Sequence, residues 1–272
     1  MKVSIYHRHL DPTSLATLES LVVSLQTAGL ETHTLTDADS AAGSDLLLSI
    51  GGDGTLLSCV QFIRSNQANP IPPILGINFG HLGFLTTLGR DNLDHLAHDL
   101  LHGRYSLEER SLLHLDGTGY ALNEVFLHRR EEDSLLSTDV FVDNQYVATY
   151  AGDGVIVATP TGSTAYSLSC GGPILTPDSR CMLITPISAH TLTLRPIIVP
   201  DTATIRLHVC NPCHLGIDSR RSHQPADTTI TLCRAPFTIS LVRMGDQNFF
   251  SAIRDKLMWG TTSHSDSPLA KQ

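Results

Sequence analysis

Five consecutive residues, Gly51-Gly52-Asp53-Gly54-Thr55, combine one carboxylate with three glycines and a hydroxyl. Glycines permit positive φ and let a ligand come close to the backbone. A helix that begins directly after such a loop points free N–H groups and a partial positive charge at the space in front of it, which favours phosphate. The stretch is a candidate phosphate-binding loop that holds Asp53 beside the ligand. The alternative is an Asp-Gly turn, in which Asp53 only shapes a hairpin.

The segments on either side of the loop favour the ligand site. Residues 46–50 form a short apolar run, as in a buried strand, and the apolar residues after the loop recur with helical spacing at Leu56, Leu57, Val60 and Ile63. A hairpin would need a second strand with period two instead. The chain contains neither G-x-x-x-x-G-K-[ST] nor G-x-G-x-x-G, which excludes a Walker-type NTPase and a standard dinucleotide fingerprint.

Two short polar stretches in the second half could bind a ligand. Asn123 and Glu124 stand at the start of an apolar strand, and an amide beside a carboxylate can hold the two vicinal hydroxyls of a ribose. Asp153 lies between two glycines. In isolation, each stretch is explained more simply as a turn at a strand end.

A run rich in hydroxyl groups follows the predicted strand 155–159. It extends from Pro160 to Ser169 and is followed by Gly171-Gly172-Pro173. Ser163 or Thr161 is available as a helix N-cap, and the Gly-Gly-Pro sequence is a stop signal. The hydroxyls suit a polar ligand such as an adenine or a ribose, although the run alone favours a short capped helix with exposed hydroxyls.

The only candidate for a metal site is Cys210-Asn211-Pro212-Cys213, with a histidine on each side. Asn-Pro is typical of a turn, the alternating residues 205–209 resemble a hairpin arm, and the sequence has no second C-x-x-C, so metal binding is disfavoured. The absence of H-E-x-x-H and G-x-S-x-G leaves hydrolysis unsupported.

Composition excludes several classes of protein. The chain has 272 residues, enough for one large or two ordinary domains, and a formal net charge of −9, which disfavours a broad nucleic-acid surface. Neither a signal peptide nor an apolar run of about 20 residues is present, so we expect a cytoplasmic protein without a membrane partner. Six scattered cysteines favour reduced thiols.

The order of predicted elements indicates two domains. In the first, strands near 3–6, 31–35, 46–50 and 74–78 alternate with helices whose apolar faces span 15–25 and 56–63, and a further helix is predicted over 91–101. This alternation predicts an α/β domain with a parallel sheet and Asp53 at the carboxyl end of a strand.

The pattern of predicted elements changes near residue 100, from alternating strands and helices to short strands. Short strands are predicted at 140–142, 146–150, 155–159, 204–209, 228–232 and 237–242, which indicates a β-rich second domain. Helical spacing returns with Phe249, Phe250, Ile253 and Leu257. We therefore predict an α/β domain of residues 1–100 plus about 243–272, a β-rich domain of 101–242, and a C-terminal helix packed back on the first domain. The polar tail from Thr261 is expected to be loose.

Taken together, these stretches resemble the NAD kinase family, whose members phosphorylate NAD to NADP. The resemblance covers nearly the whole chain. It rests on the glycine loop, Gly76-Ile77-Asn78 with Gly80-His81-Leu82-Gly83-Phe84, Leu122-Asn123-Glu124, Gly152-Asp153-Gly154, the run 159–173, and Leu257-Met258-Trp259-Gly260. The glycine loop alone also resembles lipid kinases and phosphofructokinases, whereas the hydroxyl run at this distance after Asn-Glu is specific.

The resemblance implies that NAD lies between an N-terminal α/β and a C-terminal β-rich domain. Asp53 would be the general base toward the 2′-hydroxyl of the adenosine ribose, which attacks the γ-phosphate of ATP, while the loop amides and Mg²⁺ carry the developing charge. Because an aspartate is a weak base for an alcohol, proton removal would be late. Binding of NAD and ATP is then implied for Gly51, Gly52, Asp53, Gly54, Thr55, Phe84, Asn123, Glu124, Asp153, Thr164, Ala165, Tyr166, Ser167, Leu168 and Ser169.

Within that set, Asn123 and Glu124 would hold the ribose hydroxyls, Phe84 would pack near the adenine, and Asp153 would face the nicotinamide half. Ala151 and Arg220 depart from the family pattern, so no contact is carried over to them. The family also implies a homodimer or homotetramer. The alternatives are a lipid or sugar kinase that shares the glycine loop, and a non-catalytic NAD(H) sensor. The Asn-Glu pair opposes the first, and the presence of Asp53 opposes the second.

Overall fold

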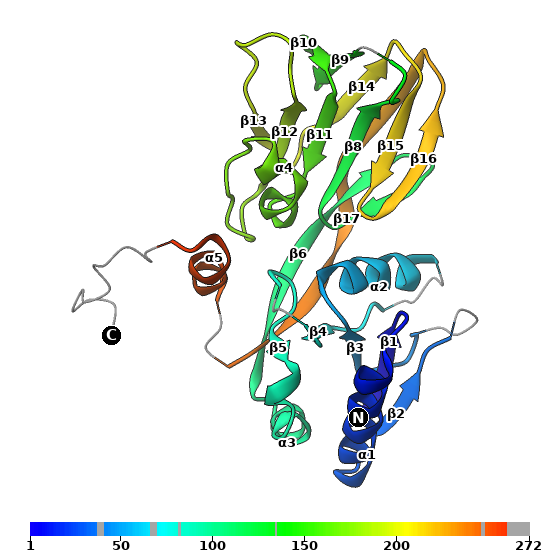
Figure 1. The fold of residues 1–272 in the computed structure, drawn as a ribbon, viewed down its shortest axis with the longest axis vertical. Helices are drawn as coiled ribbons and strands as arrows, with labels where there is room; N and C mark the ends of the chain where they lie inside the picture. Colours follow the sequence, from blue (N-terminus) through cyan, green and yellow to red (C-terminus); the bar gives the residue numbers. More distant parts are fainter. Residues whose placement is uncertain (37–40, 66–69, 81–82, 134, 246–247, 260–272) are drawn as a thin grey trace, which may run out of the picture. The chain divides into compact units, whose positions relative to one another are not determined.

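The structure is a computed structural model in which residues 1–36, 41–65, 70–80, 83–133, 135–245 and 248–259 are described. The chain divides into two compact units (Figure 1). Unit 1 comprises Met1–Glu108 and the segment from Ser240 onward, and unit 2 is the continuous stretch Glu109–Ile239. Two long strands, β6 (Tyr105–Leu115) and β17 (Thr228–Met244), run from one unit into the other.

Unit 1 is an α/β structure. Its elements are β1 (Lys2–His7), α1 (Pro12–Thr27), β2 (Glu31–Thr34), β3 (Leu46–Ile50), α2 (Asp53–Ser65), β4 (Ile74–Asn78), β5 (Leu88–Gly89), the 3₁₀ helix η1 (Arg90–Asn92), α3 (Leu96–Leu101) and α5 (Phe249–Leu257). The strands pair in the order β17-β4-β3-β1-β2, and each of these pairings is parallel. The predicted parallel sheet is confirmed.

Helices pack on both faces of this sheet. Alternate residues of β3 join a core that also contains apolar side chains of α1 and α3, among them Leu25 and Leu100. On the other face, α2 lies so close to β4 that a Cβ at Gly76 would be 2.9 Å from Cδ1 of Leu56. Parallel strands that are buried on both faces need helices on both sides. Because α2 follows β3 in the chain, the start of α2 lies at the carboxyl end of the sheet.

Local sequence signals explain where α1 begins and ends. Asp11 is the N-cap and accepts a hydrogen bond from the N–H of Ser14 (3.0 Å), and Pro12 occupies the first helical position. After the helix, Gly29 adopts φ +88°, which glycine tolerates without strain.

Unit 2 is rich in β-strands. Its elements are β7 (Gly119–Ala121), β8 (Glu124–Arg129), β9 (Leu136–Val142), β10 (Gln145–Gly152), β11 (Gly154–Ala158), the 3₁₀ helix η2 (Thr161–Thr164), α4 (Tyr166–Ser169), β12 (Cys181–Ile187), β13 (Ile197–Pro200), β14 (Ile205–Val209), β15 (Cys213–Ile217) and β16 (Arg220–Gln224). One sheet has the order β13-β12-β11-β8-β15-β16, and the other contains β10-β9-β14-β17 with β6 and β7.

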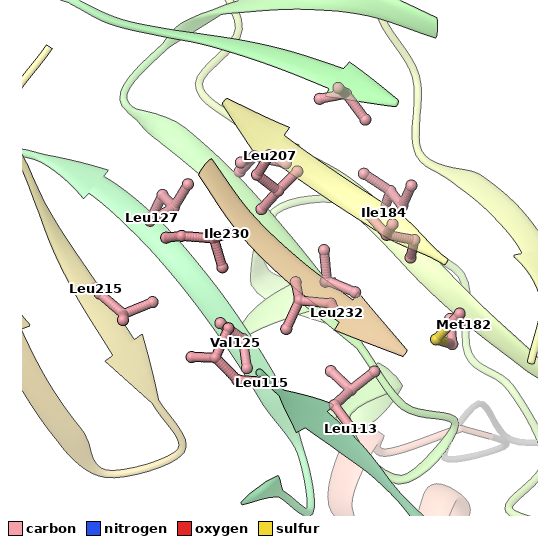
Figure 2. Close-up of a cluster of buried hydrophobic side chains, with 14 of the residues drawn as sticks. Leu113, Leu115, Val125, Leu127, Met182, Ile184, Leu207, Leu215, Ile230 and Leu232 are labelled. Atoms are coloured by element: carbon pink, nitrogen blue, oxygen red, sulfur yellow. The ribbon is translucent and has the colours of Figure 1, made fainter. Parts of the chain in front are cut away.

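Apolar side chains from both sheets of unit 2 form one core. Figure 2 shows Val125 and Leu127 of β8 with Leu215 of β15, together with Leu207 and Ile230 from strands of the other sheet. All of these residues are less than 9% exposed. Successive side chains of a strand point to opposite faces, so Phe126, between Val125 and Leu127, points away from this core and belongs to another apolar cluster.

Several predicted elements are wrong in detail. The helix predicted over 91–101 is a 3₁₀ turn followed by the short α3. The two strands predicted at 228–232 and 237–242 are one continuous strand, β17. Residues 205–209 are not a hairpin arm paired with the next strand along the chain, because β14 and β15 belong to different sheets. The helix α4 begins after Ala165 without a side-chain cap, so neither Thr161 nor Ser163 is its N-cap.

A C-terminal helix is present as α5, with Asn248 and Ser251 forming a reciprocal capping box. The tail predicted to be loose from Thr261 lies outside the described residues, as do His81, Leu82 and Gly260. Over the described parts of the chain, helices are too short or too polar to span a membrane.

Candidate active site

The glycine loop joins β3 directly to α2. Gly51 has φ +139°, and a Cβ there would lie 2.4 Å from Oγ1 of Thr55, so only glycine fits. The Gly51 N–H donates to the carbonyl oxygen of Ile77 (2.9 Å), which ties the turn to β4. Helix α2 then begins at Asp53. The loop therefore presents the N-terminus of a 13-residue helix, the arrangement that favours an anion.

The Asp53 carboxylate is held by the segment that follows β4. Its Oδ2 accepts from the N–H of Phe84 (2.8 Å), and its Oδ1 accepts from the N–H of Leu85 (3.2 Å) and Thr86 (3.1 Å). The Thr86 hydroxyl is the fourth donor to the carboxylate and the third to Oδ1, at 3.2 Å. The side chain is thus fixed in one orientation, with Oδ2 the less occupied oxygen of the two.

Two glycines allow this close approach. A Cβ at Gly83 would lie 1.8 Å from Oδ1 of Asp53, and one at Gly76 would lie 3.0 Å from Cα of Thr86. Thr86 also accepts from the N–H of Gly83 (2.9 Å) and from Nδ2 of Asn78 (3.3 Å). Residues 83–86 therefore wrap around the carboxylate and are held there by these hydrogen bonds. We call these four residues the strap.

In unit 2, a second carboxylate orders the Asn-Glu pair. Asp218 is 8% exposed, and its oxygens accept from the N–H groups of Leu122 (2.9 Å), Asn123 (2.8 Å) and Glu124 (3.1 Å). Asp218 has φ +49°, a left-handed conformation that Asp tolerates better than most residues. The start of β8 is thereby fixed, and with it the two side chains for which the family resemblance implies ribose binding.

The strand β11 and the turn after it complete this support. The Thr159 N–H donates to the Asn123 carbonyl oxygen (2.9 Å), and the Thr159 hydroxyl donates to that of Leu122 (2.6 Å). A Cβ at Gly162 would lie 2.1 Å from the Asn123 carbonyl oxygen. The start of the hydroxyl run therefore packs directly against Asn123 and Glu124, so these two stretches come together.

Asn123 and Glu124 each keep an unsatisfied acceptor. Within the described part of the chain, Oδ1 of Asn123 and Oε2 of Glu124 are buried and have no hydrogen-bond partner. Burial raises the pKa of Glu124 to about 8, with a further increase from the nearby Asp218 carboxylate, while the Tyr166 N–H lowers it. Buried polar atoms without partners are costly, so these two oxygens are positioned for a ligand with hydroxyl groups, which can both donate and accept hydrogen bonds.

The other predicted residues of the hydroxyl run have different surroundings. The Tyr166 backbone N–H contacts the Glu124 carboxyl group, and its ring packs edge-on against Phe126 at 5.4 Å. Ser167 is fully buried, and its hydroxyl is 2.8 Å from that of Thr185, so it faces the protein interior. Thr164, Ala165 and Leu168 are half-buried, whereas Ser169 is exposed.

Asp153 forms an ion pair. Its Oδ1 accepts from Nε of Arg129 at 2.6 Å, and this bond keeps the pKa of the carboxyl group below its ordinary value. Its own N–H and carbonyl oxygen bond to Ile187 and Arg129 in the backbone network. The structure therefore shows a positioned, charge-compensated carboxylate next to Ala151 and Gly152 of β10.

The Cys210 to Cys213 stretch connects β14 to β15. Cys210 is exposed, whereas Cys213 is fully buried, and burial raises the pKa of its thiol to about 11. Among the residues that the structure describes, no three His, Cys, Asp or Glu side chains converge as metal ligands.

The sequence motifs do not indicate a functional role for Thr86 or Asp218. Each takes part in hydrogen bonds between a carboxylate and N–H groups distant in sequence, 33 residues apart for Thr86 and Asp53 and 95 for Asp218 and Asn123. The only local signals were the threonine pair after a glycine-rich stretch and an Asp in a turn between two strands, and both are common in proteins without a site.

Two solved kinase structures share this fold. The structure of yeast NADH kinase complexed with NADH superposes with a TM-score of 0.86 and 24% identity, over 98% of this chain and 90% of that one. An NAD kinase from Archaeoglobus fulgidus in complex with ATP gives 0.80 and 23%, over 95% and 99%.

Sequence comparison identifies the family. The ATP-NAD kinase N-terminal domain matches residues 6–105, and the ATP-NAD kinase C-terminal domain matches 122–244. The NAD kinase of Christiangramia forsetii is 40% identical over 228 residues, and that of Porphyromonas gingivalis is 41% identical over 224, each over 79% of this chain and 76% of the relative. The chain belongs to the ATP-NAD kinase family and is an enzyme of that class, as the sequence motifs predict.

Proposed function

We propose that this enzyme transfers the γ-phosphate of ATP to the 2′-hydroxyl of the adenosine ribose of NAD and so produces NADP. The observation that carries the proposal is the pair of buried, unsatisfied acceptors on Asn123 and Glu124 in a chain of this family. The vicinal hydroxyls of a ribose each donate and accept, so they match the Asn123 amide oxygen and the Glu124 carboxyl group in either protonation state. A lipid substrate offers no reason for this pair, and a sensor needs no carboxylate in the glycine loop.

In this proposal, Asp53 is the general base. Its carboxylate is held by three backbone N–H groups and one hydroxyl, so its orientation is set before the substrate binds. Oδ2, which accepts one of these bonds, keeps lone pairs for the ribose 2′-hydroxyl. Because phosphoryl transfer depends mostly on positioning and electrostatics, a weak but well-oriented base is sufficient to remove the proton late in the reaction.

The phosphates of ATP are assigned to the glycine loop and the N-terminus of α2. Mg²⁺ is expected to enter bound to those phosphates and to neutralise part of their charge. We also assign the enzyme to the cytoplasm and expect it to act as a homo-oligomer.

The test is formation of NADP from NAD, ATP and Mg²⁺, with NADH assayed in parallel. Asp53→Ala and Asp53→Asn are expected to lower kcat by about 100-fold or more while NAD binding, measured by calorimetry, is retained. Both substitutions also remove hydrogen bonds to the strap of residues 83–86. Thr86→Val therefore serves as the comparison, because it weakens the strap without removing the carboxylate, and it should lower kcat by only about 10-fold.

The outcomes separate the parts of the proposal. If the wild type forms NADP but the Asp53 variants lose no more activity than Thr86→Val, Asp53 is an anchor for the strap and not the base. If the wild type binds NAD and forms no NADP or NADPH, the transfer reaction is wrong for this chain and NAD sensing replaces it.

A further inference from the structure

A second feature of unit 2 is a cavity of about 320 Å³ on the face of β8, β15 and β16 that points away from the core shown in Figure 2. Of its lining residues, only Tyr166 is among those for which the family resemblance implies nucleotide binding. Three are histidines, one is an arginine, and two are aromatic. The lining residues are Phe126, His128, Tyr166, His214, Arg221, Ser222 and His223.

Strand register brings the histidines into one row. His128 of β8 is directly opposite His214 of β15, which is in turn opposite His223 of β16. The rings of His214 and His223 have centroids 4.6 Å apart. Directly opposed residues have Cβ atoms about 5 Å apart, so the three imidazoles form a continuous polar wall of N–H groups and ring nitrogens.

The next row supplies an aromatic floor and a fixed positive charge. Phe126, Gly216 and Arg221 are opposed across the same three strands. A Cβ at Gly216 would lie 2.1 Å from the Phe126 ring, so glycine leaves room for this ring beside the backbone of β15. The Arg221 guanidinium lies 5.9 Å from the ring centroid, close enough for a cation–π contact. Within the described residues, no carboxylate forms an ion pair with Arg221.

Tyr166 connects the cavity to the Asn-Glu pair, because it lines the cavity and also contacts Glu124. Its backbone N–H contacts the Glu124 carboxyl group, and its side chain lines the cavity. Glu124, Phe126 and His128 alternate along β8, so they lie on the same face. A ligand whose ribose is held at Glu124 can therefore extend along this face toward Arg221 and the histidine row.

The chemistry of this wall favours phosphate over other ligands. A guanidinium is always charged and matches phosphate oxygens with two parallel N–H donors. The imidazoles of His214 and His223 add further N–H donors, whereas Nδ1 of His128 donates to the carbonyl oxygen of Arg129 (2.8 Å), so His128 offers its Nε2. Metal binding is disfavoured because no group of three metal-binding side chains converges in the described part of the chain. With a net charge of −9, the protein attracts anions only where positive groups gather locally.

We propose that Arg221 and the row His128, His214 and His223 form a subsite for a phosphate group of a nucleotide, with the aromatic floor of Phe126 and Tyr166 beneath it. Two sources share this chemistry. One is the pyrophosphate of the dinucleotide held at Asn123 and Glu124, and the other is a second nucleotide that regulates the enzyme. Only the choice between these sources rests on the proposed function.

The subsite is tested first with inorganic pyrophosphate, in the absence of ATP and NAD. Titration is followed by the ¹H and ¹⁵N resonances of the histidine imidazoles. The expected result is saturable shifts of His128, His214 and His223, with at least about 10-fold weaker binding in Arg221→Gln. Arg206→Gln is the matched control, because Arg206 lies 5.1 Å from the ring of Phe141 in the other sheet and should leave the titration unchanged.

A kinetic measurement then identifies the source. If the phosphate belongs to the dinucleotide, Arg221→Gln should raise KM for NAD about 10-fold with little change in kcat, whereas Arg206→Gln should not. If it belongs to a regulator, KM for NAD should stay constant, and the effect of added pyrophosphate or AMP on the rate should disappear in Arg221→Gln.

Two results would overturn the subsite. One is the absence of imidazole shifts in the wild type even at pyrophosphate concentrations well above those at which the enzyme uses ATP and NAD. The other is equal affinity for pyrophosphate in the wild type and in Arg221→Gln. Because neither observation requires turnover, failure of the subsite is distinguishable from failure of the kinase reaction.

Discussion

Asp53 and Asp218 perform the same task in the two units. Each carboxylate accepts hydrogen bonds from three consecutive backbone N–H groups, those of residues 84–86 and 122–124 respectively. Charge-assisted bonds of this kind are stronger than those between neutral groups. The enzyme thus uses two short acidic side chains to fix the backbone at the two places where the proposed function needs accurate geometry.

Glu124 is the buried group whose ionisation should be visible in stability. Its pKa is raised from 4.5 to about 8, so the folded protein retains a proton that the unfolded chain releases between these values. The free energy of unfolding should therefore fall as pH rises from about 4.5 to 8, by up to about 1.4 kcal/mol per pH unit. In Glu124→Gln this contribution is absent.

The measurement is urea unfolding, followed by circular dichroism, at several pH values between 5 and 9. The readout is the slope of stability against pH, because a constant offset between the two proteins reflects the changed hydrogen bonds. Glu19→Gln, at an exposed position of α1, should keep the wild-type slope. Parallel curves for the wild type and Glu124→Gln would mean that Glu124 is not protonated in the folded protein at neutral pH.

At the residue scale, the sequence identified side chains whose type and local spacing carry information. The glycine loop, the Asn-Glu pair and the run around Tyr166 all predict the family correctly. Thr86, Asp218 and Gly216 could not be found in this way, because their importance depends on what lies across a strand or a loop. The contacts of the predicted binding residues with NAD and ATP stay predictions.

At the scale of elements, glycines decide how closely loops approach the strands and Asp53. Gly83→Ala should displace the strap of residues 83–86, because the added Cβ would lie 1.8 Å from Oδ1 of Asp53 and backbone donors would be left unsatisfied. We expect a loss of about 2–3 kcal/mol in stability and at least a 100-fold loss of kcat.

Thermal unfolding and the rate of NADP formation measure these two effects. Gly89→Ala is the control, since a Cβ at that position meets nothing within 4 Å, and it should resemble the wild type in both assays. A Gly83→Ala enzyme with normal activity would show that the contact between the strap and Asp53 is not needed for the reaction.

Element types were more predictable than element lengths. The buried strand β3 and the helix α2 follow from apolar spacing, whereas β17 was predicted as two strands because Arg234, Ala235 and Pro236 interrupt the apolar pattern. Its length comes from tertiary pairing, since one part pairs with β14 and another with β4. Single-residue patterns do not contain that information.

At the scale of the whole molecule, the edges of the sheets in unit 2 favour self-association. β10 and β13 each end a sheet, and both expose apolar side chains, with Tyr146 58% exposed and Ile198 51% exposed. An apolar edge strand with free backbone groups is a template for pairing with another chain. A second copy of this chain is the partner that the proposed homo-oligomer requires.

Sedimentation velocity on the intact enzyme tests this expectation. We expect the wild type to sediment as a dimer or tetramer, and Ile198→Lys to shift the equilibrium toward lighter species by at least about 10-fold in Kd, because a charge would then be buried in the contact. Val23→Lys changes a 60% exposed apolar residue of α1 in unit 1 and should sediment as the wild type does.

If Ile198→Lys and the wild type form the same oligomer with the same Kd, β13 lies outside the contact between subunits. A monomeric wild type would contradict the proposed homo-oligomer.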